Sequence, residues 1–185
     1  MHDGQRSGYE KSMIALLSAL AQAQPCTQTI DPDATPQVIP AAELPALIRQ
    51  QSGCVVLIEL YASWCGPCAT IDPQVSTLVE AHRPSGLVTL GLSVDTNRGA
   101  WLQWRKTHGR AYAPRILTDW TLAGLATSFA ELGVTFESAV PFMVLLNAEG
   151  EAVMSLSEPD DLSALDRAIG GLLQPGGDDP VRAVR

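Results

Sequence analysis

Residues 55–68, VVLIELYASWCGPC, decide how this chain folds. The first seven residues are an apolar, β-branched run, which is typical of a strand buried on both faces. A helical pattern follows, so Cys65 is expected where the strand has ended and a helix begins. Unpaired backbone N–H groups and the helix dipole stabilise an anion there, so the Cys65 thiol should have a lowered pKa and be the attacking sulfur. Cys68 follows one helical turn later, within reach of a disulfide with Cys65.

Two other interpretations of the cysteine pair remain open. A Cys-x-x-Cys pair can be half of a zinc site, which needs two further soft ligands. The other candidate ligands are scattered along the chain: Cys26, Cys54, His2, His82 and His108. That scatter disfavours zinc but leaves a metal-binding or metallochaperone module as an alternative function. A purely structural disulfide is the second alternative, although a tight loop between strand and helix is more typical of a redox pair.

Glu59 is the one charged residue in the apolar run. Burial there would desolvate its carboxyl group and raise the pKa. From beneath the motif, Glu59 could take and return the proton of Cys68, directly or through a water molecule. The alternatives are that Glu59 faces solvent or is a buried acid with satisfied hydrogen bonds. Its apolar neighbours favour the catalytic interpretation.

Composition narrows the class of protein. The chain has 185 residues, 46% of them hydrophobic and 17% charged, with a formal net charge of −8. That is enough for one domain with tails and a well-filled core. The acidic balance and the lack of a basic patch exclude a nucleic-acid-binding class. Four cysteines do not make a disulfide-rich scaffold, and no apolar run in the body of the protein has the length of a transmembrane helix.

The first 24 residues resemble an export signal. An apolar core over residues 13–21 is followed by small residues at the spacing of a signal-peptidase site, with cleavage expected after Ala23. Arg6 and Lys11 precede the core but are offset by acidic residues, so a cytosolic protein with an amphipathic N-terminal helix is the alternative. We expect a periplasmic or otherwise exported protein, with a membrane tether only if this segment is uncleaved.

The rest of the chain alternates strand and helix patterns. Residues 25–40 are proline-rich and indicate an extended lead-in, and residues 174–185 indicate a disordered tail. Between them, apolar runs predict strands over 54–61, 87–94, 138–146 and 151–156, with a strand or extended link over 112–117. Helical patterns cover 41–51, 66–82, 97–108, 119–132 and 159–173, with a kink at Pro73, an N-cap at Asp119 and a stop at Gly133. We therefore predict three segments: lead-in 1–39, one domain over 40–173, and tail 174–185.

Several motifs in this order resemble the thioredoxin-fold oxidoreductases. The string at 64–68, WCGPC, is identical to the thioredoxin active-site motif. Pro73 matches that family's helix-kinking proline, and Glu59 stands where thioredoxins carry a buried aspartate. Residues 93–95 match the end of the next strand, and Val140-Pro141 matches the pair that contains the family's cis-proline. The resemblance covers about residues 40–173 and implies a thioredoxin fold, an α/β architecture with a central mixed sheet flanked by helices.

Two features point to a subgroup. The stretch between Asp95 and Pro141 is far longer than in plain thioredoxin and holds an extra helix and strand. The exported, often membrane-tethered proteins of the TlpA/ResA type carry an insertion there, and residues 113–133 resemble their pattern. That subgroup usually has Asn in place of Glu59, and the string at 59–65 is closer to the C-terminal domain of the thiol reductase DsbD.

The resemblance also implies a function, a protein-disulfide reductase. Reduced Cys65 would attack a disulfide in a partner protein, and Cys68 would resolve the mixed disulfide. The Gly-Pro pair between the cysteines matches thioredoxin, a reductant, so we expect net reduction of disulfides. An upstream thiol protein would supply the electrons, since no flavin or nicotinamide motif is visible, and no cofactor is expected. A cytosolic thioredoxin-like enzyme is the alternative.

Five residues are expected to contact the substrate. The resemblance assigns Val140 and Pro141 to the groove wall that presents backbone groups to an extended substrate strand. Trp64, Gly66 and Pro67 would border the sulfurs, although Trp64 could also be a packed core aromatic. We expect disulfide-containing proteins as substrates.

The remaining cysteines have no clear redox role. Cys54 begins a buried strand, which favours a packed thiol. Cys26 lies in the lead-in, and a Cys26–Cys54 bridge is conceivable in an oxidising compartment.

Overall fold

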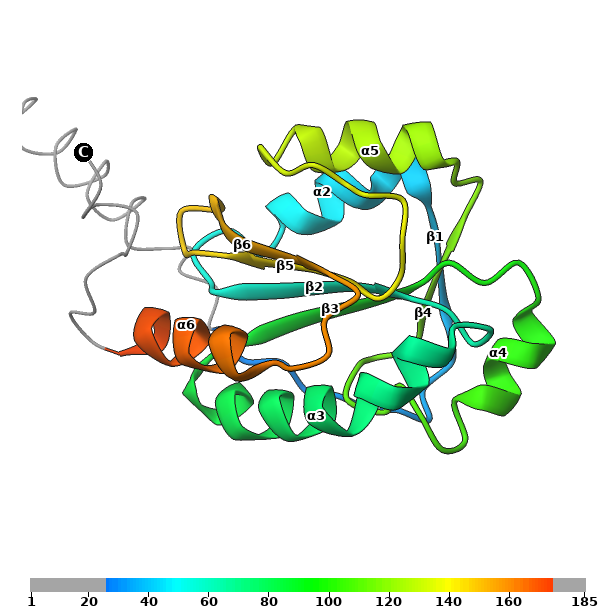
Figure 1. The fold of residues 1–185 in the computed structure, drawn as a ribbon, viewed down its shortest axis with the longest axis horizontal. Helices are drawn as coiled ribbons and strands as arrows, with labels where there is room; N and C mark the ends of the chain where they lie inside the picture. Colours follow the sequence, from blue (N-terminus) through cyan, green and yellow to red (C-terminus); the bar gives the residue numbers. More distant parts are fainter. Residues whose placement is uncertain (1–25, 175–185) are drawn as a thin grey trace, which may run out of the picture.

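A six-stranded mixed sheet forms the centre of the computed structural model, which describes residues 26–174 (Figure 1). The strands lie in the order β1-β4-β3-β2-β5-β6. Their bounds are β1 (Gln37–Pro40), β2 (Val56–Tyr61), β3 (Val88–Ser93), β4 (Arg115–Thr118), β5 (Phe142–Leu146) and β6 (Ala152–Ser157). Strands β1 to β4 are parallel to one another, and β5 and β6 add an antiparallel half.

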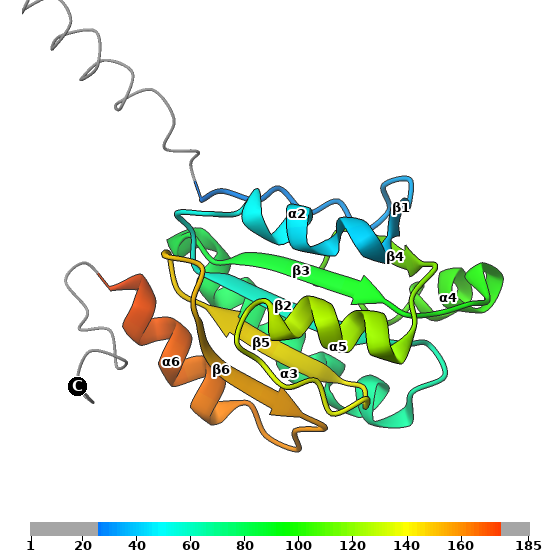
Figure 2. The same ribbon diagram turned by 90° about the horizontal axis from the view of Figure 1, so that it is seen from above.

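Helices cover both faces of this sheet. They are α2 (Leu44–Arg49), α3 (Gly66–His82), α4 (Arg98–Trp104), α5 (Leu122–Ala130) and α6 (Ser163–Leu173), with short 3₁₀ turns η1 (Ala41–Glu43) and η2 (Arg83–Ser85). Figures 1 and 2 show α2 and α5 on one face and α3 and α6 on the other. Helix α4 lies at the end of the sheet toward which β2 and β3 run. The expected architecture, a mixed sheet between helices with an inserted helix and strand, is confirmed.

Strand β2 lies in the middle of the sheet. All six of its residues are buried, with β3 parallel on one side and β5 antiparallel on the other. This is the environment that the continuous apolar run predicts, because a strand covered on both faces has no side facing water. Residues 62–65, which follow β2 directly, therefore lie at a fixed position where the central strands end.

The lead-in contributes more to the sheet than expected. Residues 37–40, assigned from the sequence to the lead-in, form the edge strand β1 and pair with β4. Strand β4 lies between β1 and β3, and its ladder pairing with β3 consists of the one residue pair Ser93 and Ile116. Near the start of β3, the Gln28 side chain donates to the Thr89 carbonyl and accepts from the Thr89 N–H, both at 2.9 Å. A side-chain amide thus satisfies backbone groups of β3 that no neighbouring strand reaches.

Several helix boundaries differ from the expectations; α6, for example, begins at Ser163 and not at residue 159. Helix α5 begins at Leu122, and Thr121 is its N-cap, with its hydroxyl accepting from the Gly124 N–H at 3.0 Å. The expected N-cap at Asp119 was wrong, since that residue has a left-handed φ of 55°. Helix α4 ends at Trp104, four residues short of the predicted stretch. Helix α3 matches its predicted bounds and contains Pro73 without ending there.

Cys26 and Cys54 form a disulfide, with Cα atoms 5.4 Å apart. The interpretation of Cys54 as a packed thiol was therefore wrong, although its position before a buried strand is as expected. The bridge ties the start of the described lead-in to the residues just before β2. The bridge that the sequence left only conceivable is thus present; spacing alone could not establish it, because a strand and a helix lie between the two cysteines, which are 28 residues apart in the sequence.

Replacing both Cys26 and Cys54 by serine should lower the free energy of unfolding by roughly 3 kcal/mol, because the unfolded chain regains the freedom that a loop of this length loses on closure. Urea unfolding without reductant measures the loss. A double Cys65→Ser, Cys68→Ser variant is the matched control and should lose less, because its loop is far shorter. If the Cys26→Ser, Cys54→Ser variant and the wild type were equally stable, the disulfide would not stabilise the fold, which would contradict this prediction.

The expected export segment and tail lie outside the described residues. Within residues 26–174, no helix combines the length and apolar character needed to cross a bilayer.

Candidate redox site at the start of helix α3

Cys65 caps the N-terminus of α3. Its backbone is extended, and its Sγ accepts a hydrogen bond from the Cys68 N–H at 3.0 Å. Cys65 and Cys68 are joined by a disulfide, so the structure shows the oxidised state. After reduction, the same N–H and the positive end of the 17-residue helix would face the Cys65 sulfur. Both favour the thiolate over the thiol, so this placement suits a nucleophilic sulfur.

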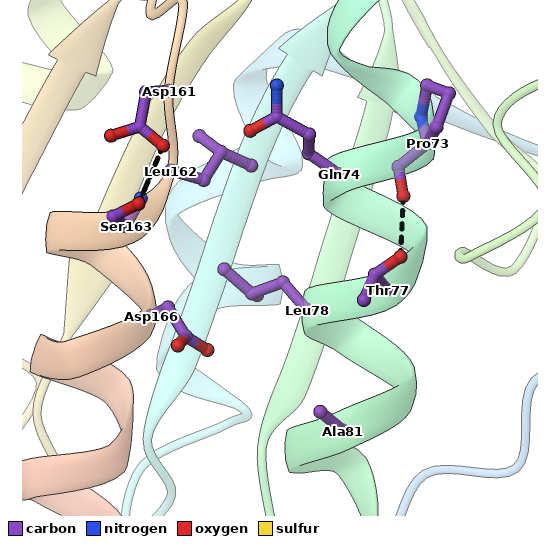
Figure 3. A pocket seen from close by; sticks show the side chains of 9 residues that line it. All are labelled: Pro73, Gln74, Thr77, Leu78, Ala81, Asp161, Leu162, Ser163 and Asp166. Atoms are coloured by element: carbon purple, nitrogen blue, oxygen red, sulfur yellow. Dashed lines mark hydrogen bonds between the residues drawn. The ribbon is translucent and has the colours of Figure 1, made fainter.

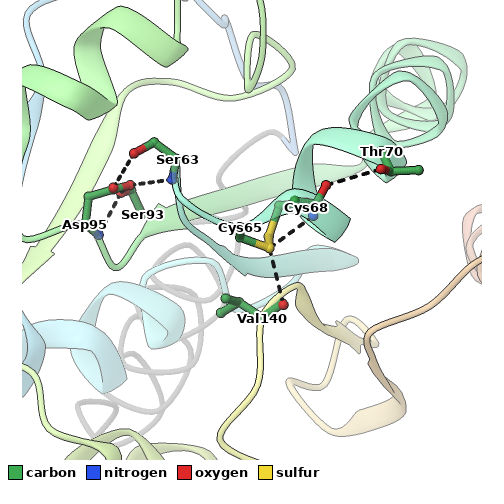
Figure 4. The surroundings of a disulfide bond; sticks show 8 residues. Ser63, Cys65, Cys68, Thr70, Ser93, Asp95 and Val140 are labelled. Atoms are coloured by element: carbon green, nitrogen blue, oxygen red, sulfur yellow. Dashed lines mark hydrogen bonds between the residues drawn. A yellow bond between two sulfur atoms is a disulfide. The ribbon is translucent and has the colours of Figure 1, made fainter.

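A second chain segment lies against the Cys65 sulfur. The Val140 carbonyl oxygen is 3.3 Å from Cys65 Sγ (Figure 4). The Val140–Pro141 peptide bond is cis, as the matching of this pair to the family's cis-proline predicts. Pro141 is buried and leads directly into β5. The carbonyl of Val140 therefore stands beside the sulfurs, where a substrate backbone could meet it.

The loop before the cysteines is held by Asp95. This carboxylate accepts from the Ser63 N–H at 2.9 Å and from the Ser63 and Ser93 hydroxyls (Figure 4). Asp95 is itself buried, at 3% exposure. The sequence placed Asp95 only at the end of a strand, and the structure adds this hold on the active-site loop.

The residues next to the sulfurs are exposed. Gly66 and Pro67 are both open to solvent, and Trp64 is 65% exposed, so it is not a core aromatic. The disulfide itself is largely covered, with Cys65 at 5% and Cys68 at 2% exposure. A partner would therefore approach Cys65 across a surface bordered by Trp64 and Val140.

A pocket of about 260 Å³ continues this surface. Trp64 and Val140 border it, and Trp120, Leu125 and Phe136 add apolar walls from the inserted segment and the loop before β5. A larger pocket of about 560 Å³ lies between α3 and α6, where Leu78 faces Leu162 and neither cysteine takes part (Figure 3). Of these two pockets, only the smaller one is lined by Trp64 and Val140, the residues that border Cys65.

Glu59 is buried in β2, at 4% exposure, which excludes the solvent-facing alternative. Burial, reinforced by the negative charge of Asp72, raises the pKa of Glu59 to about 8. Asp72 lies in α3 one turn beyond Cys68, and burial raises its pKa as well. A carboxyl group with a pKa near neutrality can both accept and release a proton under ordinary conditions.

The inserted segment closes over this carboxyl group. The Tyr112 hydroxyl donates to Glu59 Oε2, and the Gly109 N–H donates to Asp72 Oδ1 at 2.8 Å. Arg105, only 4% exposed, holds the segment by donating to the carbonyls of Gly109, Tyr112 and Pro32, the last two at 3.1 Å.

Sequence reasoning missed Asp72, Arg105 and Tyr112. Gly91 was the available signal, because a glycine inside an apolar strand often marks a close approach of another chain segment.

No cluster of three or more His, Cys, Asp or Glu side chains suited to a metal ion occurs in the described part of the chain.

Part of the chain is similar to known thioredoxins. Residues 37–103 match the thioredoxin family model. Over 49 residues, the chain is 37% identical to thioredoxin-1 of Caenorhabditis elegans. This aligned stretch covers 26% of this chain and 41% of that protein. The chain spans about two fifths of the length of the first curated relatives it matches.

Solved structures agree on the fold. A thiol:disulfide interchange protein of the thioredoxin family from Chlorobium tepidum superposes with a TM-score of 0.56 at 19% identity, covering 68% of this chain and 84% of that one. A secreted thiol-disulfide isomerase from Corynebacterium glutamicum gives 0.55 at 21% identity, covering 68% and 74%. The fold is the thioredoxin fold, with a helix and a strand inserted between β3 and β5.

Proposed function

We propose that this protein is a thiol-disulfide oxidoreductase that acts mainly as a disulfide reductase. The premise is its thioredoxin fold with a Cys-Gly-Pro-Cys pair at the start of α3. The observation that carries the proposal is the position of Cys65 Sγ at the helix N-cap, 3.0 Å from the Cys68 N–H. A sulfur in that position is a better thiolate than free cysteine. The match to the thioredoxin family model supports the same chemistry.

The reaction has two exchanges. The Cys65 thiolate attacks one sulfur of a partner's disulfide, which breaks and leaves the other sulfur as a thiolate that takes a proton. Cys68 then loses its proton, attacks Cys65 and expels the second partner sulfur. The partner gains two electrons and two protons, and Cys65–Cys68 becomes the disulfide seen in the structure.

Glu59 is the proposed proton acceptor for Cys68. Its burial and its raised pKa, about 8, support this role, since its carboxylate would then be a strong enough base to assist a thiol. The carboxyl group would return the proton when an upstream thiol protein reduces the disulfide again. No step requires a bound cofactor.

The substrates are proposed to be disulfide-containing proteins. The Val140 carbonyl beside Cys65 supports recognition of a partner's backbone, which is common to all sequences. Trp64, Gly66 and Pro67 are exposed around the sulfurs, and Pro141 follows Val140 in the chain. The apolar pocket next to Val140 supports a preference for a large apolar side chain near the partner's cysteine.

We also propose export. The signal-like pattern of residues 1–24 supports it, and so does the Cys26–Cys54 disulfide, because such bonds persist mainly in oxidising compartments. The solved neighbour from Corynebacterium glutamicum is described as secreted. N-terminal sequencing of the mature protein should find a start near Gln24.

The reduction potential of Cys65–Cys68 tests the direction of the reaction. We expect a value near that of thioredoxin, about −270 mV, because the Gly-Pro pair between the cysteines is the same. Equilibration with dithiothreitol buffers, read by alkylation and mass, gives the potential. The measurement belongs in the Cys26→Ser, Cys54→Ser background, where only one couple titrates. A value near that of the oxidant DsbA, about −120 mV, would overturn the reductase direction.

A further inference from the structure

Because Gly91 has no side chain, a residue from outside β2 and β3 can pack against β3 at this position. It lies on β3 directly opposite Glu59 in the register with β2. A Cβ atom at Gly91 would overlap the ring of Tyr112, so no larger residue fits while the ring is there. The ring of Tyr112 thus occupies the space beside Glu59 that a side chain of β3 would otherwise fill.

Tyr112 reaches this space from the loop between α4 and β4. The residue is 2% exposed, and its hydroxyl donates to Glu59 Oε2. Its ring stacks on Tyr61, with centroids 5.9 Å apart, and its carbonyl accepts from the buried Arg105 guanidinium. Backbone and ring are therefore both held, so the hydroxyl has a defined position.

We propose that Tyr112 is a positioning residue that holds the Glu59 carboxyl group in the orientation needed to exchange a proton with Cys68. The inference rests on the proposed function and deepens it, because it gives the inserted segment a part in the second exchange. With one carboxyl oxygen bound to the hydroxyl, rotation of the group is restricted. The attack of Cys65 on the partner does not need this contact.

The hydroxyl also acts on the charge of Glu59. A hydrogen bond donated to a carboxylate favours its ionised form and opposes the effects of burial and of Asp72 from α3. The other ionisable groups nearby are Tyr61 on the same strand, and Arg105 and His108, which act on Asp72. Loss of the Tyr112 hydroxyl alone should therefore raise the pKa of Glu59 further.

Tyr112→Phe tests the proposal in the full-length reduced protein. A stopped-flow reaction with Ellman's reagent separates the attack of Cys65 from the release of the second thiolate by Cys68. The rate of each phase is followed between about pH 5 and about pH 9. In the variant, the pH midpoint of the second-phase rate should rise by about one unit, and below that midpoint the second phase should be about tenfold slower than in the wild type. The rate of the first phase should stay unchanged. An unshifted midpoint, or equal slowing of both phases, would overturn the proposal.

Tyr61→Phe is the matched control. It removes a hydroxyl from the same aromatic cluster, one that accepts from Trp101 at 3.3 Å and from Arg105 at 3.5 Å and that makes no hydrogen bond to Glu59 within residues 26–174. Its second-phase midpoint should match the wild type. A shift as large as that of Tyr112→Phe would mean that general loosening of the cluster explains the effect, and the proposal would fail.

A measurement on the wild type keeps the test valid if Tyr112→Phe does not fold. The hydroxyl proton of Tyr112 should exchange slowly enough to give an NMR signal, and that signal should move as Glu59 titrates. Absence of a coupled signal would refute the contact. Failure of the proposed function looks different, since the wild type would then show no rapid first phase with Ellman's reagent.

Discussion

Replacing Cys65 by serine is expected to abolish disulfide reduction, with a loss of roughly a thousandfold or more, because a serine hydroxyl cannot attack a disulfide sulfur at neutral pH. Replacing Cys68 by serine should stop the reaction one step later. Cys65 would still stand at the N-cap of α3 and attack, but no second sulfur could release it. The two variants therefore separate nucleophile from resolving thiol.

Reduction of insulin under dithiothreitol measures the loss, and mass spectrometry shows the trapped species. Cys68→Ser should accumulate a mixed disulfide with a model substrate, whereas Cys65→Ser should form none. The Cys26→Ser, Cys54→Ser variant is the control and should keep its activity, because that disulfide lies before β2 and outside the site. Undiminished turnover by Cys65→Ser would refute the assignment of the nucleophile.

Glu59→Gln should remove a large pH dependence of stability. The carboxyl group has a pKa of about 8 in the folded protein and an ordinary value of 4.5 when unfolded. Between those values the folded state binds more protons than the unfolded state, so stability falls as pH rises. For the oxidised wild type, the contribution of this group should fall by about 4 kcal/mol from about pH 5 to about pH 9.

Urea unfolding of the oxidised protein at several pH values checks this prediction. The Glu59→Gln variant should lack that fall and be the more stable protein at alkaline pH, since its amide keeps a hydrogen-bond acceptor for Tyr112 without a buried charge. Glu137→Gln, at an exposed position, is the matched control and should follow the wild type. Parallel pH profiles of wild type and Glu59→Gln would contradict a buried, high-pKa carboxyl group.

The residues close together in the chain were the predictable part of the site. The strand-to-helix junction at Cys65, the disulfide reach to Cys68 and the burial of Glu59 all follow from local pattern. The cis bond at Val140–Pro141 was predicted from a motif match, and its contact with Cys65 bridges 75 residues. Strand pairing of β2 with β5 brings those two segments together.

The inserted segment was the unpredictable part. Residues 112–117 could be read only as a strand or a link, since neither periodicity nor capping residues distinguish the two. Nothing local indicates that Tyr112 crosses β3 at Gly91 to reach Glu59, or that Arg105 binds the carbonyl of Pro32 in the lead-in. These contacts depend on where β4 lies in the sheet.

The sequence by itself determined the order of elements, the buried strand β2 and the placing of two sulfurs at a helix start, because hydrophobic period and motif spacing act over a few residues. Only the tertiary structure decided which groups surround the buried acid and which cysteines close the second disulfide. These contacts depend on packing between segments tens of residues apart, and the free energy of that packing cannot be inferred from the local sequence pattern.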